Sequence, residues 1–261
     1  MENKKYAWIN GIMLVCTVVV NYLSNTGIVQ GNTMKTVSDE YFTRFTPAGY
    51  AFSIWGVIYL SLACFVVYST VHAFKRREPL PALQRIGWWF ALSCLANMCW
   101  VLAWLSHYTL LSVFIMAVLL LSLLVIVVRL QLSITKTSIK HYWLISFPFS
   151  LYAGWISLAI IANVASLLMK YDWNGFGLTD GTWAMILIFI AGFLNVLMVV
   201  KRNMRAYGVV GIWGLLAVAA NQPAGEKVIV YSCYGIALWI VLAIVLTCFR
   251  PLGRKSITYT V

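Results

Sequence analysis

The segment TLLSVFIMAVLLLSLLVIVVRL, residues 109–130, decides the class of fold. Arg129 is its only charged residue, and it stands next to the end of the segment. A helix needs about 20 apolar residues to cross the hydrocarbon core of a bilayer, which is about 30 Å thick. A long side chain at the end of such a helix can reach the interface with its charge. The segment therefore predicts a transmembrane helix.

Seven further apolar segments extend this reading to the whole chain. Hydrophobic residues make up 62% of the sequence and charged residues only 10%, whereas a soluble domain carries about 25% charged residues. We therefore expect an all-α, polytopic membrane helix bundle with about eight transmembrane helices and no soluble domain large enough to act alone. The predicted helices cover residues 6–23, 47–74, 86–105, 109–130, 142–169, 182–200, 206–220 and 228–249, the seventh being the shortest.

The basic residues test this count, because positive charge gathers in the cytoplasmic loops of membrane proteins. When the loops are assigned alternately to two sides, fifteen Lys and Arg fall on the side of the N-terminus and four on the other. Both termini are thus predicted to be cytoplasmic, in an integral protein of the bacterial inner (cytoplasmic) membrane. The net charge of +12 lies in short loops and indicates topology, so we expect no nucleic-acid partner. The four exceptions are Lys35, Arg44, Lys170 and Lys227.

The sequence offers little for catalysis or metal binding. No Lys, Arg, Asp or Glu lies deep within a predicted span, and the six cysteines show no CxxC spacing. His72, His107 and His141 lie near helix ends or in connections. We therefore predict no catalytic residue, no metal ligand and no certain cofactor.

Tryptophan and asparagine inside the helices are the remaining candidates. Asn97 and Trp100 are three residues apart, and Trp155, Ala159 and Asn163 are spaced by four, so each set shares a helix face. Such faces suit a pocket lined by aromatic rings with a few amides for orientation, where Ala159 leaves room for a flat ring. The alternative is that the amides only form interhelical hydrogen bonds and that the tryptophans mark the membrane interface.

The same spacing occurs a second time, in the seventh predicted helix. Trp213, Ala217 and Asn221 repeat the pattern W-x-x-x-A-x-x-x-N. The repetition hints at an internal repeat, a feature of many transporter folds.

Three motifs, in order along the chain, resemble those of the TspO/MBR family, the tryptophan-rich sensory or translocator proteins. One motif lies where the chain enters the second predicted helix. The motif N-x-x-W follows in the third predicted helix, and the motif W-x-x-x-A-x-x-x-N in the fifth. Together the motifs cover about residues 6–170. The residues that carry the resemblance, and that it implies bind the ligand, are Pro47, Tyr50, Phe52, Trp55, Tyr59, Asn97, Trp100, Trp155, Ala159 and Asn163.

The resemblance implies two parts and a ligand. Residues 1–170 would form a five-helix membrane domain of this family, and residues 171–261 a three-helix C-terminal membrane extension without counterpart in it. The implied ligand is a porphyrin. Cholesterol binding is not carried over, because the cholesterol-type motif of animal members is absent. Two further departures are Tyr50, where Trp is usual, and the spacing of Phe52 and Trp55, which is one residue short.

We therefore expect a tryptophan-rich sensory or translocator-like membrane protein that binds a hydrophobic planar ligand such as a tetrapyrrole (porphyrin). The pocket is expected among the second, third and fifth helices, on the non-cytoplasmic side, with residues 24–46 folded over its mouth. Two alternatives stay open: a small-solute transporter and a membrane enzyme that degrades a porphyrin. The expected partners are the lipid bilayer and a hydrophobic small molecule, and a homodimer is an open alternative for the assembly.

Overall fold

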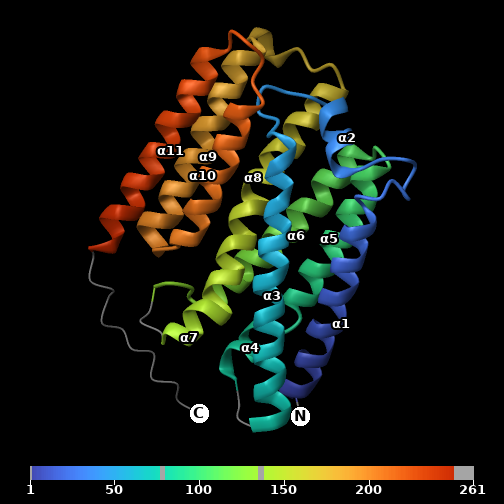
Figure 1. Ribbon diagram of the computed structural model, residues 1–261, viewed down its shortest axis with the longest axis vertical. Helices are drawn as coiled ribbons and strands as arrows, with labels where there is room; N and C mark the ends of the chain where they lie inside the picture. Colours follow the sequence, from blue (N-terminus) through green and yellow to red (C-terminus); the bar gives the residue numbers. More distant parts are fainter. Residues whose placement is uncertain (1, 77–79, 135–137, 250–261) are drawn as a thin grey trace.

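The computed structural model describes residues 2–76, 80–134 and 138–249, and every regular element within them is a helix (Figure 1). This confirms the prediction of an all-α polytopic bundle. Part of the predicted charge pattern lies outside the described residues: the C-terminus together with Arg77, Lys136, Arg250, Arg254 and Lys255.

Each of the eight predicted segments contains a long helix. Within the described residues, six spans are long and apolar enough to cross a membrane, judged by length and composition. Two helices are shorter, α5 with 17 residues and α10 with 16. The helices are α1 (Glu2–Leu23), α3 (Ile54–Val71), α5 (Trp89–Leu105), α6 (Thr109–Arg129), α8 (Phe147–Lys170), α9 (Asp180–Arg202), α10 (Arg205–Ala220) and α11 (Lys227–Cys248).

Short helical pieces connect or extend the long helices. α2 (Met34–Glu40) lies inside the first loop and is capped by Thr33, whose side chain accepts a hydrogen bond from the backbone N–H of Thr36. The sequence reading missed α2 because seven residues are too few for a clear periodicity. The other pieces are η1 (Gly49–Ser53), η2 (His72–Arg76), α4 (Pro81–Ile86), α7 (Ile139–His141), η3 (Tyr142–Ser146) and η4 (Gly175–Gly177).

Two predicted helix starts differ from the structure. The second helix was predicted from Pro47, but the chain stays extended there and enters α3 through the 3-10 turn η1. The third was predicted from Ile86, which instead ends α4. Gly87 has a φ of 52° and a ψ of −129°, a conformation that glycine tolerates best, and it separates α4 from α5.

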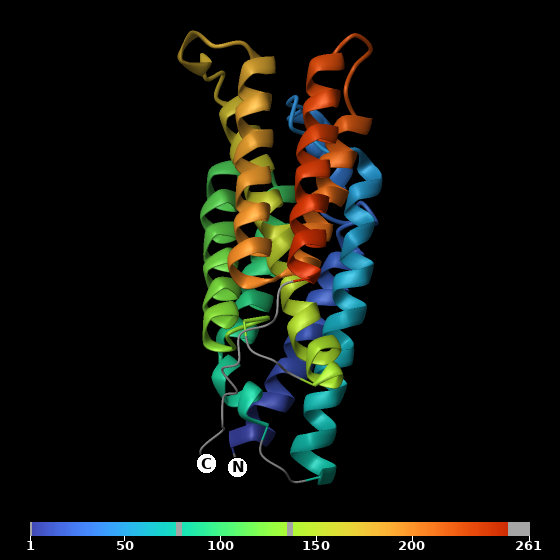
Figure 2. The same cartoon turned by 90° about the vertical axis from the view of Figure 1, so that its left-hand side faces the viewer.

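The long helices run roughly along one axis; α8 lies in the middle of the bundle, and α3 lies in front of it in Figure 1 and at one edge in Figure 2. On one side of them lie α1, α5 and α6; on the other lie α9, α10 and α11. α10 packs closely against α8. A Cβ on Gly154 would lie 3.0 Å from the carbonyl oxygen of Tyr207, so the missing side chain lets the two backbones meet.

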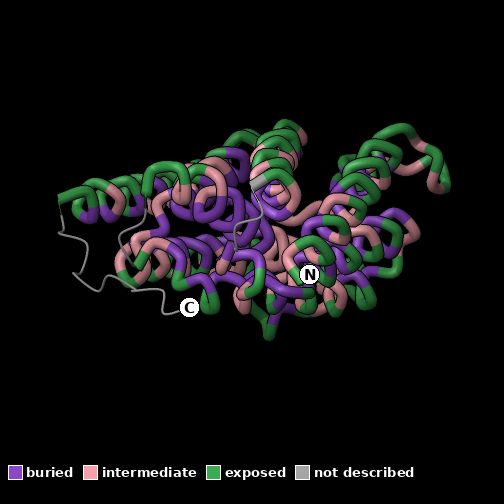
Figure 3. The backbone as a smooth tube through the Cα atoms, turned by 90° about the horizontal axis from the view of Figure 1, so that it is seen from below, coloured by how far each residue is buried: buried purple, intermediate pink, exposed green. Residues whose placement is uncertain are grey.

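The outside of the bundle is apolar. Figure 3 shows buried positions facing inward and exposed positions facing outward around the helices. Large hydrophobic side chains are among the most exposed, including Trp8, Leu60, Phe114 and Leu246, each more than 60% accessible. Such a surface is unfavourable in water and suits contact with lipid tails. The chain is an integral membrane protein.

The described basic residues separate between the two ends of the bundle (Figure 1). One end carries the start of α1, α4, α7, the end of α9 and the start of α10, with Lys4, Arg85, Lys140, Arg202 and Arg205. The opposite end carries α2, the turn between α5 and α6, and the starts of α9 and α11. Which end faces the cytoplasm stays a prediction. The basic residues of this second end are Lys35, Arg44, Lys170 and Lys227.

Candidate functional site

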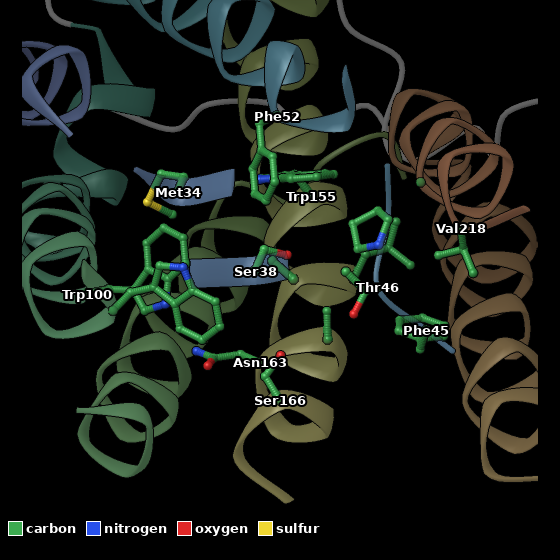
Figure 4. Close-up of a pocket in the computed structure, with 16 residues that line it drawn as sticks. Met34, Ser38, Phe45, Thr46, Phe52, Trp100, Trp155, Asn163, Ser166 and Val218 are labelled. Carbon is green, nitrogen blue, oxygen red and sulfur yellow. The ribbon is translucent and has the colours of Figure 1, made fainter. Parts of the chain in front are cut away.

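A cavity lies beneath the first loop, where α5, α8 and α10 face one another (Figure 4). Its empty volume is about 670 Å³, part of which belongs to the open mouth. None of the described residues that line it is charged. They are Met34, Ser38, Phe45, Thr46, Pro47, Phe52, Trp100, Trp104, Trp155, Leu158, Ala159, Ala162, Asn163, Ser166, Gly214 and Val218.

One face of α8 forms the longest wall. Trp155, Ala159 and Asn163 follow one another at steps of four residues, so they stack along this face over about 12 Å. Trp155 and Asn163 are buried at the two ends of the row, while Ala159 between them is half-buried. The Oδ1 atom of Asn163 accepts a hydrogen bond of 3.0 Å from the hydroxyl of Ser112 on α6.

Aromatic rings from three helices build the deep end of the cavity. The ring of Phe52 lies edge-on to Trp155, with centroids 6.4 Å apart. Trp55 lies behind the lining and contacts both Trp100 and Trp155, each at a centroid distance of 6.3 Å. Trp55 also stacks on Tyr59 at 5.3 Å. The packed rings of Trp55 and Tyr59 lie behind the lining and support the positions of the Trp100 and Trp155 side chains.

The first loop forms the roof. Met34 and Ser38 from α2 and Phe45–Pro47 from the following segment line the cavity from above, as expected for a loop folded over the mouth. The loop is tied to the turn between α5 and α6. Asn32 donates to the carbonyl of Leu105 (2.9 Å), and the hydroxyl of Tyr41 lies 3.0 Å from Nδ1 of His107.

Charged side chains lie around these contacts between the first loop and the turn, outside the cavity. The ammonium group of Lys170 lies 5.5 Å from the ring centroid of Tyr41 and donates to the carbonyl of His107. Burial and the nearby carboxylate of Glu40 raise the pKa of Tyr41 above its ordinary value. Its hydroxyl therefore stays protonated around neutral pH and keeps its contact with His107.

α10 holds the end of the first loop from the other side. The Trp213 indole donates to the carbonyl of Ala51 (3.2 Å), and the amide of Asn221 donates to the carbonyl of Thr46 (3.2 Å). The carbonyl of Ala217 accepts a bond of 2.9 Å from the N–H of Ala48. The second copy of the W-x-x-x-A-x-x-x-N pattern thus binds the backbone of residues 46–51.

The structure brings six of the ten predicted site residues to the lining of the cavity and leaves four outside it. Trp55 and Tyr59 form the layer behind the rings. Asn97 is fully buried and accepts a hydrogen bond of 2.7 Å from the amide of Asn21 on α1. Tyr50 lies half-exposed against Trp213, outside the lining. The six that line the cavity are Pro47, Phe52, Trp100, Trp155, Ala159 and Asn163.

Sequence reasoning missed several lining residues. Trp104 follows Trp100 by four positions, so the shared helix face could have indicated it. Gly214 follows Trp213 and Val218 follows Ala217 in the repeated pattern, which pointed to α10 but did not indicate which face of it would be used. The pocket was expected among the second, third and fifth predicted helices, but its helical walls are α5, α8 and α10; α3 contributes no lining residue, and only Pro47 and Phe52, which precede α3, come from the second predicted helix. No local signal singled out Met34 or Ser38.

Unpaired hydrogen-bond donors lie in the lining of the cavity and in the layer behind it. The indole N–H groups of Trp55, Trp100, Trp104 and Trp155 are buried and have no acceptor among the described residues. In the same part of the chain, no group of three His, Cys, Asp or Glu side chains could hold a metal ion. The arrangement suits binding of an apolar molecule.

Fold and site together define a class: a polytopic helical membrane protein with a tryptophan-lined cavity between its helices, roofed by a loop. Comparison with protein families agrees. A model of the family described as TSPO-like protein matches residues 7–246, and the chain belongs to this family. The match continues beyond residue 170 through α9, α10 and most of α11, whereas the motifs quoted from the sequence end at Asn163. No curated protein and no solved structure matches the chain.

Proposed function

We propose that this protein binds a hydrophobic planar ligand, such as a tetrapyrrole, as a sensory or translocator-like protein of the membrane. The observation that carries the proposal is the wall formed by Trp155, Ala159 and Asn163 opposite Trp100 and Trp104. Indole rings offer flat apolar faces, and the small side chain of Ala159 leaves space between two larger ones. Pockets for small molecules combine such apolar linings with a few polar groups.

The roof supports access from the end of the bundle that carries α2. Residues of the first loop line the cavity, so a ligand entering from this end would meet α2 and the segment that leads into η1. By the prediction from the charges, this end faces away from the cytoplasm. A ligand arriving from the outer side of a bacterial inner membrane would therefore meet the roof first.

The test is a titration of the purified protein with protoporphyrin IX, followed by absorbance and by tryptophan fluorescence. We expect saturable quenching in the wild type, and a loss of affinity of at least about tenfold in Ala159→Phe, because the added ring fills the gap in the α8 wall. Leu121→Phe is the control, since Leu121 is 60% exposed on the outside of α6 and adds no ring to the cavity.

Two outcomes would count against the proposal. One is wild-type affinity in Ala159→Phe when melting curves show a folded protein; the other is quenching that never saturates. Absorbance recorded over time separates binding from degradation, because a porphyrin that is only bound keeps its spectrum. A steady loss of the porphyrin bands would favour the membrane-enzyme alternative.

A further inference from the structure

His107 holds the first loop to the turn between α5 and α6. Its backbone is fixed within this turn, because its N–H donates to the carbonyl of Trp104 at 3.0 Å and its carbonyl accepts from the N–H of Thr109 at 2.9 Å. Its Nε2 lies 2.8 Å from the amide nitrogen of Asn32, just before α2, and its Nδ1 lies 3.0 Å from the hydroxyl of Tyr41, just after it. One imidazole ring thus contacts the chain at both ends of α2.

The partners of Asn32 determine where the proton of this ring lies. The amide nitrogen of Asn32 also donates to the carbonyl of Leu105 at 2.9 Å, so the NH2 group, and not the amide oxygen, faces Nε2. An amide nitrogen only donates, and Nε2 can accept only while it carries no proton. The ring of His107 is therefore neutral in this arrangement, with its proton on Nδ1, toward Tyr41 and Glu40.

A second proton on the ring affects only the Asn32 end of α2. This proton lies on Nε2 and points at the NH2 group of Asn32, so a donor meets a donor. Asn32 and His107 are both half-buried, and a polar group that loses its partner away from water is costly. The N–H at Nδ1 is present in both forms of the ring, and the carbonyl of Tyr41 also accepts from the hydroxyl of Ser166 at 3.4 Å. The Tyr41 end of α2 therefore stays in place.

The charged groups around the ring act in opposite directions. The carboxylate of Glu40, on α2, lies 3.6 Å from Nδ1 and favours a charged ring. The ammonium group of Lys170, on α8, donates to the carbonyl of His107 and disfavours a charged ring. The Glu40 side chain is 54% exposed, and ion pairs at such sites contribute little. Tyr41 stays neutral because its pKa is raised, so the lost bond at Nε2 outweighs the attraction of Glu40.

We propose that His107 is a pH-sensitive latch on the first loop: the neutral ring holds Asn32, and protonation releases Asn32 so that α2 pivots about its Tyr41 end. Histidine changes its charge between about pH 5 and 8, so the latch opens on mild acidification. The released end carries Met34, which lines the cavity, and its movement opens the roof. The inference goes beyond the proposed function, because it does not depend on which ligand the cavity binds.

The test is amide hydrogen exchange of the full-length protein in lipid nanodiscs, read by mass spectrometry at about pH 7.5 and about pH 5.5, on either side of the titration of histidine. The rates are corrected for the exchange of unstructured peptides at each pH. We expect the protection of residues 31–37 to fall at least about fivefold at the lower pH, because local opening exposes their amides. The protection of α8 should not change, which shows that the bundle stays folded.

Variants identify the titrating group. His107→Gln keeps a hydrogen-bonding side chain that does not titrate, so the protection of residues 31–37 should become independent of pH. His141→Gln is the matched control and should respond as the wild type does, because His141 lies in α7, at the opposite end of the bundle from α2 (Figure 1). Asn32→Ala removes the held group and should give, at both pH values, the low protection that the wild type shows in acid. The response should persist in Glu40→Gln.

Several results would overturn the inference. One is equal protection of the wild-type loop at both pH values. Another is higher protection in acid, which would mean that the pair of Glu40 with a charged ring dominates. A wild-type response in His107→Gln, or a lost response in Glu40→Gln, would assign the titration to another group. Each of these results leaves the proposed function standing, since the porphyrin titration tests it separately.

Discussion

At the scale of single residues, the structure separates two kinds of buried asparagine. Asn163 lines the cavity, whereas Asn97 joins α5 to α1 through its bond with Asn21. Thr17, one turn before Asn21, adds a contact of 3.5 Å from its hydroxyl to the carbonyl of Cys94. The sequence motif predicted that Asn97 binds the ligand, but its hydrogen-bond partner places it in a polar contact between α1 and α5.

We therefore expect Asn97→Leu to lower stability and to leave ligand affinity unchanged. The lost interhelical bond is worth about 0.6–2 kcal/mol, and the loss is limited because the amide of Asn21 also donates to the carbonyl of Thr17 at 2.9 Å. Thermal melting and porphyrin titration of the same variant measure the two effects.

Asn21→Leu and the double variant complete a cycle for this pair. The two single changes remove the same bond, so the double variant should be less destabilised than the sum of both. Additive losses of stability would show that the two amides act independently. A clear drop in porphyrin affinity in Asn97→Leu would show that Asn97 belongs to the binding site.

At the scale of elements, α8 and α10 meet closely at Gly154, which has no side chain. Gly154 faces the backbone of Tyr207, where a Cβ would lie 3.0 Å from the carbonyl oxygen and 3.1 Å from the Cα. A backbone cannot move aside as a flexible side chain can. This contact fixes the distance of α10 from α8, and with it the position of the cavity wall that α10 forms.

Gly154→Ala should lower the free energy of unfolding by about 1–3 kcal/mol, because the added methyl group forces the two helices apart. The control is Gly56→Ala in α3, where a Cβ would meet no atom within 4 Å. There the higher helix propensity of alanine should leave stability unchanged or raise it by up to about 1 kcal/mol. Equal effects at both positions in melting experiments would contradict the close packing of α8 and α10.

At the scale of the whole molecule, an apolar exterior and separated charges describe how the bundle sits in a bilayer. The helices expose large hydrophobic side chains along their length, while the described basic residues lie at the two ends. Lys140 in α7 and Asp180 at the start of α9 lie at opposite ends of α8 and its short extensions.

Reporter fusions at Lys140 and at Asp180 should therefore report opposite sides of the membrane, with Lys140 on the cytoplasmic side. Alkaline phosphatase and green fluorescent protein are suitable, since each is active on one side only. Fusions in the loop that contains Lys35 provide an internal control and should agree with Asp180. The same side for Lys140 and Asp180 would mean that α8 does not cross the membrane.

The sequence by itself determined the class of fold and much of the cavity wall. Apolar segments such as residues 109–130 have one stable environment, because a long uncharged helix satisfies its own backbone in lipid. Residues three or four apart share a helix face by geometry, so the rows with Trp100 and with Trp155, Ala159 and Asn163 could be predicted without tertiary contacts.

Only the tertiary structure decided which faces meet. Asn97 shares a face with Trp100, yet it turns to Asn21 while Trp100 lines the cavity, because α1 covers one edge of α5. Trp213, Ala217 and Asn221 repeat the α8 pattern, yet they bind the chain before α3. The spacing of residues along a helix shows which side chains share a face. What that face binds depends on which helix or loop packs against it, and that contact involves distant parts of the chain.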